Sequence, residues 1–152
     1  MQLLGIIRNR KIYHVQTRNN PDWSKLLPKS NWIALTVAHE GDEELIPIVA
    51  NACLDRNASY ICCSGELSKL SEEYFDEEIA WSAVEVPSIL ETSPITTSHH
   101  NLEEGFWFAS TIADTDRYTV DTVVCIDLTE VKVKDLLCKL IEQINIGWIP
   151  PD

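Results

Sequence analysis

Two adjacent histidines precede two adjacent glutamates in the segment TTSHHNLEEGFW, residues 96–107. Imidazole and carboxylate groups bind divalent metals, and a four-residue spacing on a helix would place such ligands on one face. That arrangement requires His99 and His100 to be helical. Asn101 followed three residues later by Glu104 is instead a capping-box pattern, which begins a helix after both histidines. We therefore predict a helix start here and no metal site.

A second group of polar residues lies at or just after the carboxyl ends of predicted strands. These strands are predicted at 58–64, 94–98 and 118–128. Loops at the carboxyl ends of parallel strands are where α/β proteins bind ligands. These positions predict an alternative function, as an enzyme or a Rossmann-like small-ligand-binding protein. The chain lacks a Gly-rich nucleotide loop and has only five glycines, so no cofactor is predicted. The candidate ligand-site residues are Ser64, Glu66, His99, His100 and Asp127.

The adjacent cysteines Cys62 and Cys63 raise the question of thiol chemistry. Neighbouring residues on a strand point to opposite faces, so the two thiols cannot act together. The acidic residues that follow would raise a thiol pKa and would repel an anionic substrate. The five cysteines show neither a disulfide framework nor a zinc spacing. We predict buried, reduced and unreactive thiols and no catalytic residue.

Acidic residues form the most extensive charged feature of the chain. The sequence has 24 Asp and Glu against 12 Lys and Arg, for a net charge of −12. Such a surface repels nucleic acid and accelerates encounter with a basic protein. Four acids gather on one side of a predicted helix at 65–82, and a loop contributes three more. The predicted partner-binding residues are Glu72, Glu73, Asp76, Glu77, Asp42, Glu43 and Glu44.

The pattern of apolar residues predicts one α/β domain, residues 1–152, with a three-layer architecture. A hairpin of strands 2–8 and 11–17, joined by an Asn9-Arg10 turn, precedes alternating strands and helices. Such alternation indicates a mostly parallel, Rossmann-like sheet with helices on both faces and the antiparallel hairpin at its edge. The remaining strands are predicted at 32–37, 58–64, 82–87, 94–98 and 118–128, and the helices from about 46, at 65–82, 102–113 and 131–145.

The predicted helix at 65–82 is expected to turn an apolar stripe toward the core. Leu67, Leu70 and Tyr74 recur at helical spacing, with Ile79 or Trp81 continuing the stripe. No apolar run approaches the roughly 20 residues that a membrane span needs. The N-terminal segment has its positive charges after its apolar stretch, which is not the order of a secretory signal. We therefore expect a cytoplasmic protein that does not contact membranes.

The size, acidity and lack of catalytic motifs resemble those of a class of small bacterial proteins. These are the immunity proteins that neutralise toxins of contact-dependent and other polymorphic toxin systems. The resemblance covers properties of the whole chain rather than a motif, so it implies a partner class and no individual site residue. It implies a non-catalytic inhibitor that binds a cationic toxin domain, such as a nuclease, through an acidic surface.

Overall fold

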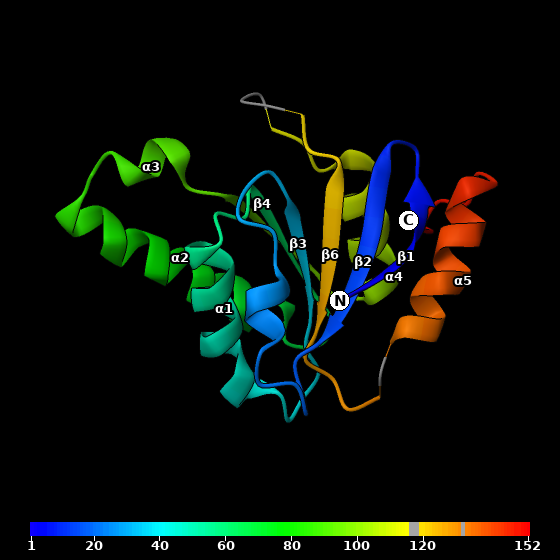
Figure 1. The fold of residues 1–152 in the computed structure, drawn as a ribbon, viewed down its shortest axis with the longest axis horizontal. Coiled ribbons are helices and arrows are strands. Elements are labelled where there is room, and N and C mark those ends of the chain that lie inside the picture. Colours follow the sequence, from blue (N-terminus) through cyan, green and yellow to red (C-terminus); the bar gives the residue numbers. More distant parts are fainter. Residues whose placement is uncertain (116–118, 132) are drawn as a thin grey trace.

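A computed structural model of the protein describes residues 1–115, 119–131 and 133–152. Its centre is a six-stranded sheet with the strand order β1-β2-β6-β3-β4-β5 (Figure 1). The strands are β1 (Gln2–Ile7), β2 (Arg10–Gln16), β3 (Ile33–Val37), β4 (Tyr60–Ser64), β5 (Ile95–His99) and β6 (Thr122–Asp127). The helices are α1 (Ile46–Asp55), α2 (Ser68–Glu85), α3 (Ile89–Thr92), α4 (Leu102–Trp107) and α5 (Lys134–Asn145), with a π-helical turn at Phe108–Ile112.

The sheet is mostly parallel, which confirms the predicted α/β architecture. Among the strands that the structure describes, only β1 and β2 pair antiparallel, as the predicted edge hairpin, and β2, β6, β3, β4 and β5 run parallel to one another. α4 and α5 contribute to the core on one face of the sheet, and α1 and α2 contribute to the core on the other. The result is a Rossmann-like arrangement of three layers (Figure 1).

The central strands are buried along their whole length because helices cover both faces. Every residue of β3 and β4 is buried, as expected for a continuous apolar run in a parallel sheet. Helix α1 begins at Ile46 with Pro47 in its first turn, where a missing backbone N–H costs nothing. This confirms the predicted helix start.

The hairpin turn lies one residue earlier than predicted. Ile7 pairs with Arg10, so Arg8 and Asn9 form the turn, and Arg8 has a φ of 53°. Ile7 and Ile12 are both fully buried. Burying both side chains on the same face of the sheet fixes this register, and tertiary packing decides it over local turn preference.

Helix α2 differs most from the prediction. It continues to Glu85, through the strand predicted at 82–87, and the short helix α3 follows it. The inward stripe is also different, because Leu70 and Trp81 are exposed. The buried residues of α2 are Ser68, Ser71 and Phe75.

Small serines let the first turns of α2 lie close to the sheet, with the Phe75 ring in the core. The predicted inward stripe is confirmed only in part, because Leu67 and Tyr74 pack against the core whereas Leu70 and Trp81 face solvent. Two predicted elements, 118–128 and 131–145, include residues 118 and 132, which lie outside the described residues. Among the helices that the structure describes, none combines the length and the apolar character needed to cross a bilayer.

Candidate functional site

The histidine and glutamate segment is a helix start, as predicted. The Asn101 side chain accepts a hydrogen bond from the Glu104 backbone N–H at 2.9 Å, directly before α4. The Glu104 carboxylate does not return to the cap residue. It accepts a hydrogen bond from His99 Nδ1 at 3.2 Å, because a carboxylate can only accept. His99 Nε2 lies 3.0 Å from Thr97 Oγ1, and its ring packs 4.9 Å from that of Phe108.

Both ring nitrogens of His99 are therefore hydrogen-bonded within the protein, and the bond of Nδ1 joins β5 to α4. His100, its neighbour, is exposed. Within residues 1–115, 119–131 and 133–152, no three His, Cys, Asp or Glu side chains are grouped so as to hold a metal ion. The segment positions two elements of the fold.

Asp127 ends β6 and is fully buried. One carboxylate oxygen accepts hydrogen bonds from the Thr129 N–H and hydroxyl, at 2.9 and 2.6 Å. The other accepts from His14 Nε2 and the Val133 N–H, both at 3.0 Å. Burial by itself raises the pKa of Asp127, but these hydrogen bonds outweigh it and lower the pKa below its ordinary value. Asp127 thereby holds the loop that leads from β6 toward α5.

The place where α/β folds usually bind ligands is occupied by an arginine of this chain. The loops after β6 and β3 lead to helices on opposite faces of the sheet, α5 and α1, which is the arrangement that forms the ligand crevice of α/β folds. Arg18 spans it, donating to Leu128 O at 2.9 Å and to the Asp42 carboxylate. The hollow that remains is about 330 Å³. Its lining includes the acidic residues Glu40, Asp42, Glu66 and Glu130, an arrangement that opposes an anionic ligand.

The loop after β4 leaves no room for an anion at its centre. Ser64 is buried, and its hydroxyl donates to Thr36 O at 2.8 Å. Gly65 has a φ of +93°, and a Cβ there would lie 2.5 Å from Ala38 O. Only glycine fits this left-handed, tightly packed position. Glu66 is exposed and accepts from a backbone N–H of the neighbouring loop at 3.4 Å.

The structure places Ser64 beside His99, which pair across β4 and β5, but it does not gather the five residues of the predicted ligand site into one site. Ser64, His99 and Asp127 are buried and bonded within the protein, while Glu66 and His100 are exposed. Asp127 lies on β6, which β3 separates from the β4 strand that carries Ser64. These side chains serve separate parts of the framework.

The cysteines are free thiols, and four of the five are buried. Burial raises the pKa of Cys62 to about 12 and raises those of Cys53, Cys63 and Cys125 as well. Because thiolates are the reactive species, we expect Cys138 alone to react quickly with Ellman's reagent in the native protein. The other four should react only after unfolding in guanidinium. Rapid native reaction of more than one thiol would contradict this prediction.

The predicted acidic residues are not equally available to a partner. Asp42 is buried, ion-paired to Arg18, and accepts a hydrogen bond from the His39 N–H at 2.8 Å. These contacts hold the loop after β3 in its conformation. Glu43 and Glu44, in the same loop, are exposed. On α2, Glu73, Asp76 and Glu77 are exposed, whereas Glu72 is partly buried.

One side of α2 combines acidic and apolar side chains that are exposed to solvent. Residues 70, 73, 77, 81 and 84 recur at spacings of three and four, which places them along one face of the helix. We call this set, Leu70, Glu73, Glu77, Trp81 and Val84, the outer face of α2. Leu70 is 45% exposed, Trp81 71% and Val84 73%. Sequence reasoning placed Leu70 in the core and offered Trp81 as an inward residue, so it missed this surface.

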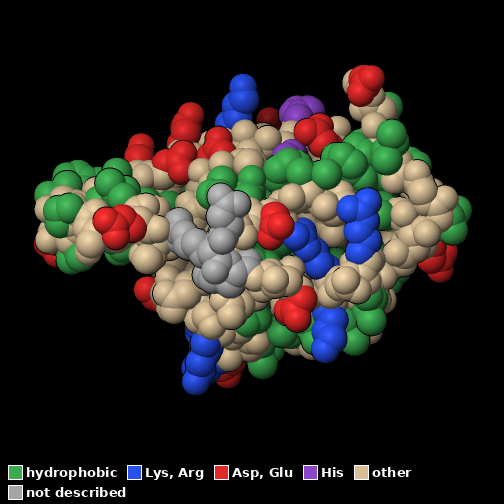
Figure 2. All heavy atoms as spheres, turned by 90° about the horizontal axis from the view of Figure 1, so that it is seen from above, with side chains coloured by type: hydrophobic (Ala, Val, Ile, Leu, Met, Phe, Trp, Pro, Cys, Tyr) green, Lys and Arg blue, Asp and Glu red, His purple; other side chains and the backbone are tan. Residues whose placement is uncertain are grey.

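The C-terminal part of the outer face, with Trp81 and Val84, lies on an arm that extends beyond the sheet. The last turns of α2 and the helix α3 project to one side of the molecule (Figure 1). Figure 2 shows hydrophobic side chains gathered over this end, with acidic side chains along the adjoining margin. Val86 and Leu90, at the turn and in α3, are also more than half exposed. An exposed apolar surface with a charged border is typical of an interaction site.

The charge of the protein is concentrated in the same part of the chain. Residues 70–116 hold 11 of the 24 acidic residues and none of the 12 lysines and arginines. Elsewhere acids and bases nearly balance, so almost all of the net charge of −12 comes from this segment. It contains most of α2 and all of α3, β5 and α4. This absence of bases was a signal in the sequence that could have located the surface.

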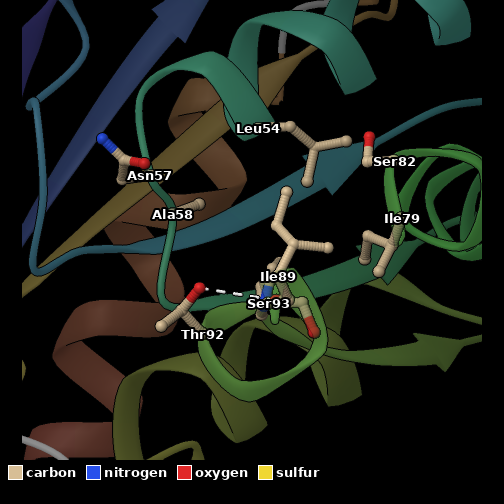
Figure 3. A pocket seen from close by; sticks show the side chains of 9 residues that line it. Leu54, Asn57, Ala58, Ile79, Ser82, Ile89, Thr92 and Ser93 are labelled. Carbon is tan, nitrogen blue, oxygen red and sulfur yellow. Dashed lines mark hydrogen bonds between the residues drawn. The ribbon is translucent and has the colours of Figure 1, made fainter. Parts of the chain in front are cut away.

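A pocket of about 260 Å³ lies between α1 and the arm (Figure 3). Leu54 of α1, Ile79 of α2 and Ile89 of α3 point toward one another across it. The rest of its lining is small or neutral, with no ionisable side chain: Asn57, Ala58, Ser82, Thr92, Ser93 and Pro94. Such a pocket can accept an apolar group, and its lining side chains include no general acid or base that could activate a hydroxyl.

Comparison with known proteins gives a family but no described function. No curated protein and no solved structure matches the chain. A family model described as "Domain of unknown function (DUF7684)" matches residues 10–144. This match covers most of the chain, from the start of β2 almost to the end of α5. The protein therefore belongs to the DUF7684 family.

Proposed function

We propose that this protein is a non-catalytic inhibitor that binds a cationic protein on the outer face of α2. In this proposal the partner is a toxin domain, and binding neutralises it, as expected of an immunity protein. The site of action is the cytoplasm, where free thiols such as these five stay reduced. The observation that carries the proposal is the alternation of exposed Leu70, Trp81 and Val84 with Glu73 and Glu77.

A helix face that only keeps a protein soluble would not contain these apolar residues. Exposed tryptophan is costly in water and is enriched at the centres of protein interfaces. Glu73 and Glu77 are four residues apart, and like charges at this spacing destabilise a helix slightly. A basic partner removes both costs, because it covers the ring and neutralises the carboxylates.

The scarcity of lysine and arginine nearby determines the sign of the partner's charge. Exposed carboxylates on α2 attract cations from a distance, and Lys69 is the only lysine or arginine of this helix, with none in residues 70–116. The partner surface that fits is therefore lysine- or arginine-rich around an apolar recess that receives the indole. Because the charged rim steers the encounter, the association rate should fall steeply between low and high salt.

Photo-crosslinking from the arm tests the proposal. Benzoylphenylalanine replaces Ala80, an exposed residue of α2, while Trp81 stays intact. Irradiation of the full-length protein in its native cells should yield one main adduct with a basic protein. The matched control carries the same group at Glu142, an exposed residue of α5, and should not give that adduct. Equal crosslinking from both positions, or adducts with acidic proteins only, would contradict the proposed site.

Two further measurements with the captured protein test inhibition. Expressed alone it should stop cell growth, and co-expression of the wild-type inhibitor should restore growth. The double variant Glu73→Gln/Glu77→Gln should restore it poorly. In stopped-flow mixing, the wild-type association rate should drop at least about tenfold from low to high salt. A harmless partner would contradict the toxin assignment, and a rate independent of salt would contradict the charge mechanism.

A further inference from the structure

We propose that the cationic partner also adds a β-strand to the free edge of β5. This inference rests on the proposed function and specifies how the partner is held. β5 is the last strand of the sheet and has a neighbour, β4, on one side only. An unpaired strand edge presents backbone donors and acceptors that another extended chain can bond.

The outward backbone groups of β5 can be identified from its pairing. The Gly65 N–H donates to His99 O at 3.2 Å, so His99 turns its backbone toward β4. Backbone direction alternates along a strand, so Thr96 and Ser98 turn their N–H and C=O groups outward. No hydrogen bond to these four groups is formed by any residue within the described ranges.

The opposite edge of the sheet is protected in ways that β5 is not. In β1 the register shifts between Leu3 and Gly5, an irregularity that blocks regular pairing. Asn145 of α5 also donates to Ile6 O at 2.9 Å and so satisfies one outer carbonyl. β5 contains no register shift, proline or lysine, and its register with β4 is continuous over all five residues.

Carboxylates flank the free edge on both faces of the sheet. On the α2 face, Thr96 Oγ1 donates to Asp76 Oδ1 at 2.6 Å, which places this carboxylate beside an outward-facing residue. On the α4 face, Glu104 is bonded to His99 at the end of the strand. Side chains of an added strand alternate between the two faces. A strand with lysine or arginine on either face would therefore meet an acid, and a strand carrying acids would be repelled.

The acids also connect the edge to the outer face of α2. Asp76 borders β5, while Glu73 and Glu77 stand beside it on the same helix and belong to the outer face. A partner that covers Trp81 can therefore extend a strand along β5 without leaving the acidic surface. The occupant that fits is an extended, basic segment of the same cationic protein.

A designed peptide tests this mode directly on the full-length protein. The probe is a fluorescent peptide of alternating lysine and valine, and fluorescence anisotropy measures its binding. A second peptide has the same sequence with an N-methyl group on every residue, which keeps the side-chain charges but removes all of the backbone N–H donors. We expect saturable binding of the first, binding at least about tenfold weaker of the second, and none of a glutamate–valine peptide.

A variant on the protein side provides the matching test. Ser98→Pro removes an outward N–H without breaking a bond to β4, and Ser98→Ala is its control. Ser98→Pro should weaken binding of the lysine–valine peptide at least about tenfold, while Ser98→Ala should leave it unchanged. Circular dichroism checks that Ser98→Pro folds. If this variant does not fold, the comparison of the N-methylated and unmodified peptides on the wild-type protein tests strand addition instead.

The outcomes separate this inference from the proposed function. Strand addition is overturned if the N-methylated peptide binds as well as the unmodified one, or if neither binds. The proposed function is then still supported if the partner crosslinked from Ala80 binds in a salt-dependent manner. Loss of that partner together with retained peptide binding would overturn the proposed function and leave the β5 site standing.

Discussion

Replacing Asp127 with alanine should lower the free energy of unfolding by about 3–5 kcal/mol. The carboxylate accepts four hydrogen bonds in a fully buried setting, and alanine accepts none. The donors left behind include the buried imidazole of His14 and the N–H groups of Thr129 and Val133. Each buried, unpaired donor costs roughly 1–3 kcal/mol. Urea unfolding of the wild-type and variant proteins at neutral pH measures the difference.

Asp127→Asn is the matched control for this position. The amide keeps the size of the carboxylate but retains one accepting oxygen, so it can satisfy only part of the donor set. We expect it to lie between the wild type and Asp127→Ala in stability. A loss below about 1 kcal/mol for Asp127→Ala would show that the β6–α5 loop does not depend on this residue.

The same carboxylate should make stability depend on pH in one direction. Its folded pKa lies below the ordinary value of 3.8, so the unfolded chain binds the proton more readily than the folded chain. Stability therefore rises with pH through this range, and the contribution is complete above the unfolded pKa. It is lost as the pH falls through the folded pKa. The stability difference between wild type and Asp127→Asn should accordingly shrink as unfolding is measured at pH values from 5 toward 3.

Replacing Trp81 with alanine should weaken binding of the cationic partner at least about 30-fold while leaving the fold intact. An indole at the centre of an interface typically contributes 2 kcal/mol or more, which corresponds to about this factor. The ring is 71% exposed in the free protein, so stability should change by less than about 0.5 kcal/mol. Isothermal titration calorimetry with the partner crosslinked from Ala80 gives the affinity, and urea unfolding gives the stability.

Ile146→Ala is the matched control, because Ile146 is 87% exposed but follows α5, far along the chain from the acidic segment. Its removal should leave the affinity unchanged. If Trp81→Ala bound the partner as tightly as the wild type, the outer face of α2 would not be the binding surface. A large loss of stability in Trp81→Ala would show that the ring packs against the protein.

The elements most accurately predicted were those whose sequence signal and tertiary role agree. Asn101 and Glu104 specify a helix start through contacts between near neighbours, and that start was confirmed. Pro47 cannot lie in the interior of a helix, so this residue alone places a helix start nearby, and α1 begins at the preceding residue, Ile46. The apolar runs of β3 and β4 can be stable only when buried on both sides, which implied the parallel sheet.

The candidate ligand site could not be judged in the same way. The sequence places Ser64, His99 and Asp127 at strand ends, where either catalysis or framework bonding is chemically possible. The difference lies in partners far away in the chain, such as His14 for Asp127, which is 113 residues away. Such long-range contacts cannot be predicted from residue type and spacing. Asp42 is a similar case, because its ion pair with Arg18 withdraws it from the surface.

By itself, the sequence determined the alternation of strands and helices that builds the mostly parallel sheet, the start of α4 and the concentration of acids in residues 70–116. These follow from local backbone chemistry and from composition, which require no knowledge of what packs where. Tertiary structure decided the rotation of α2 about its axis. Phe75 and two serines fit against the sheet, so Leu70 and Trp81 turned outward among the glutamates. Because one helix can bury only one face against the core, that packing choice also created the surface offered to a partner.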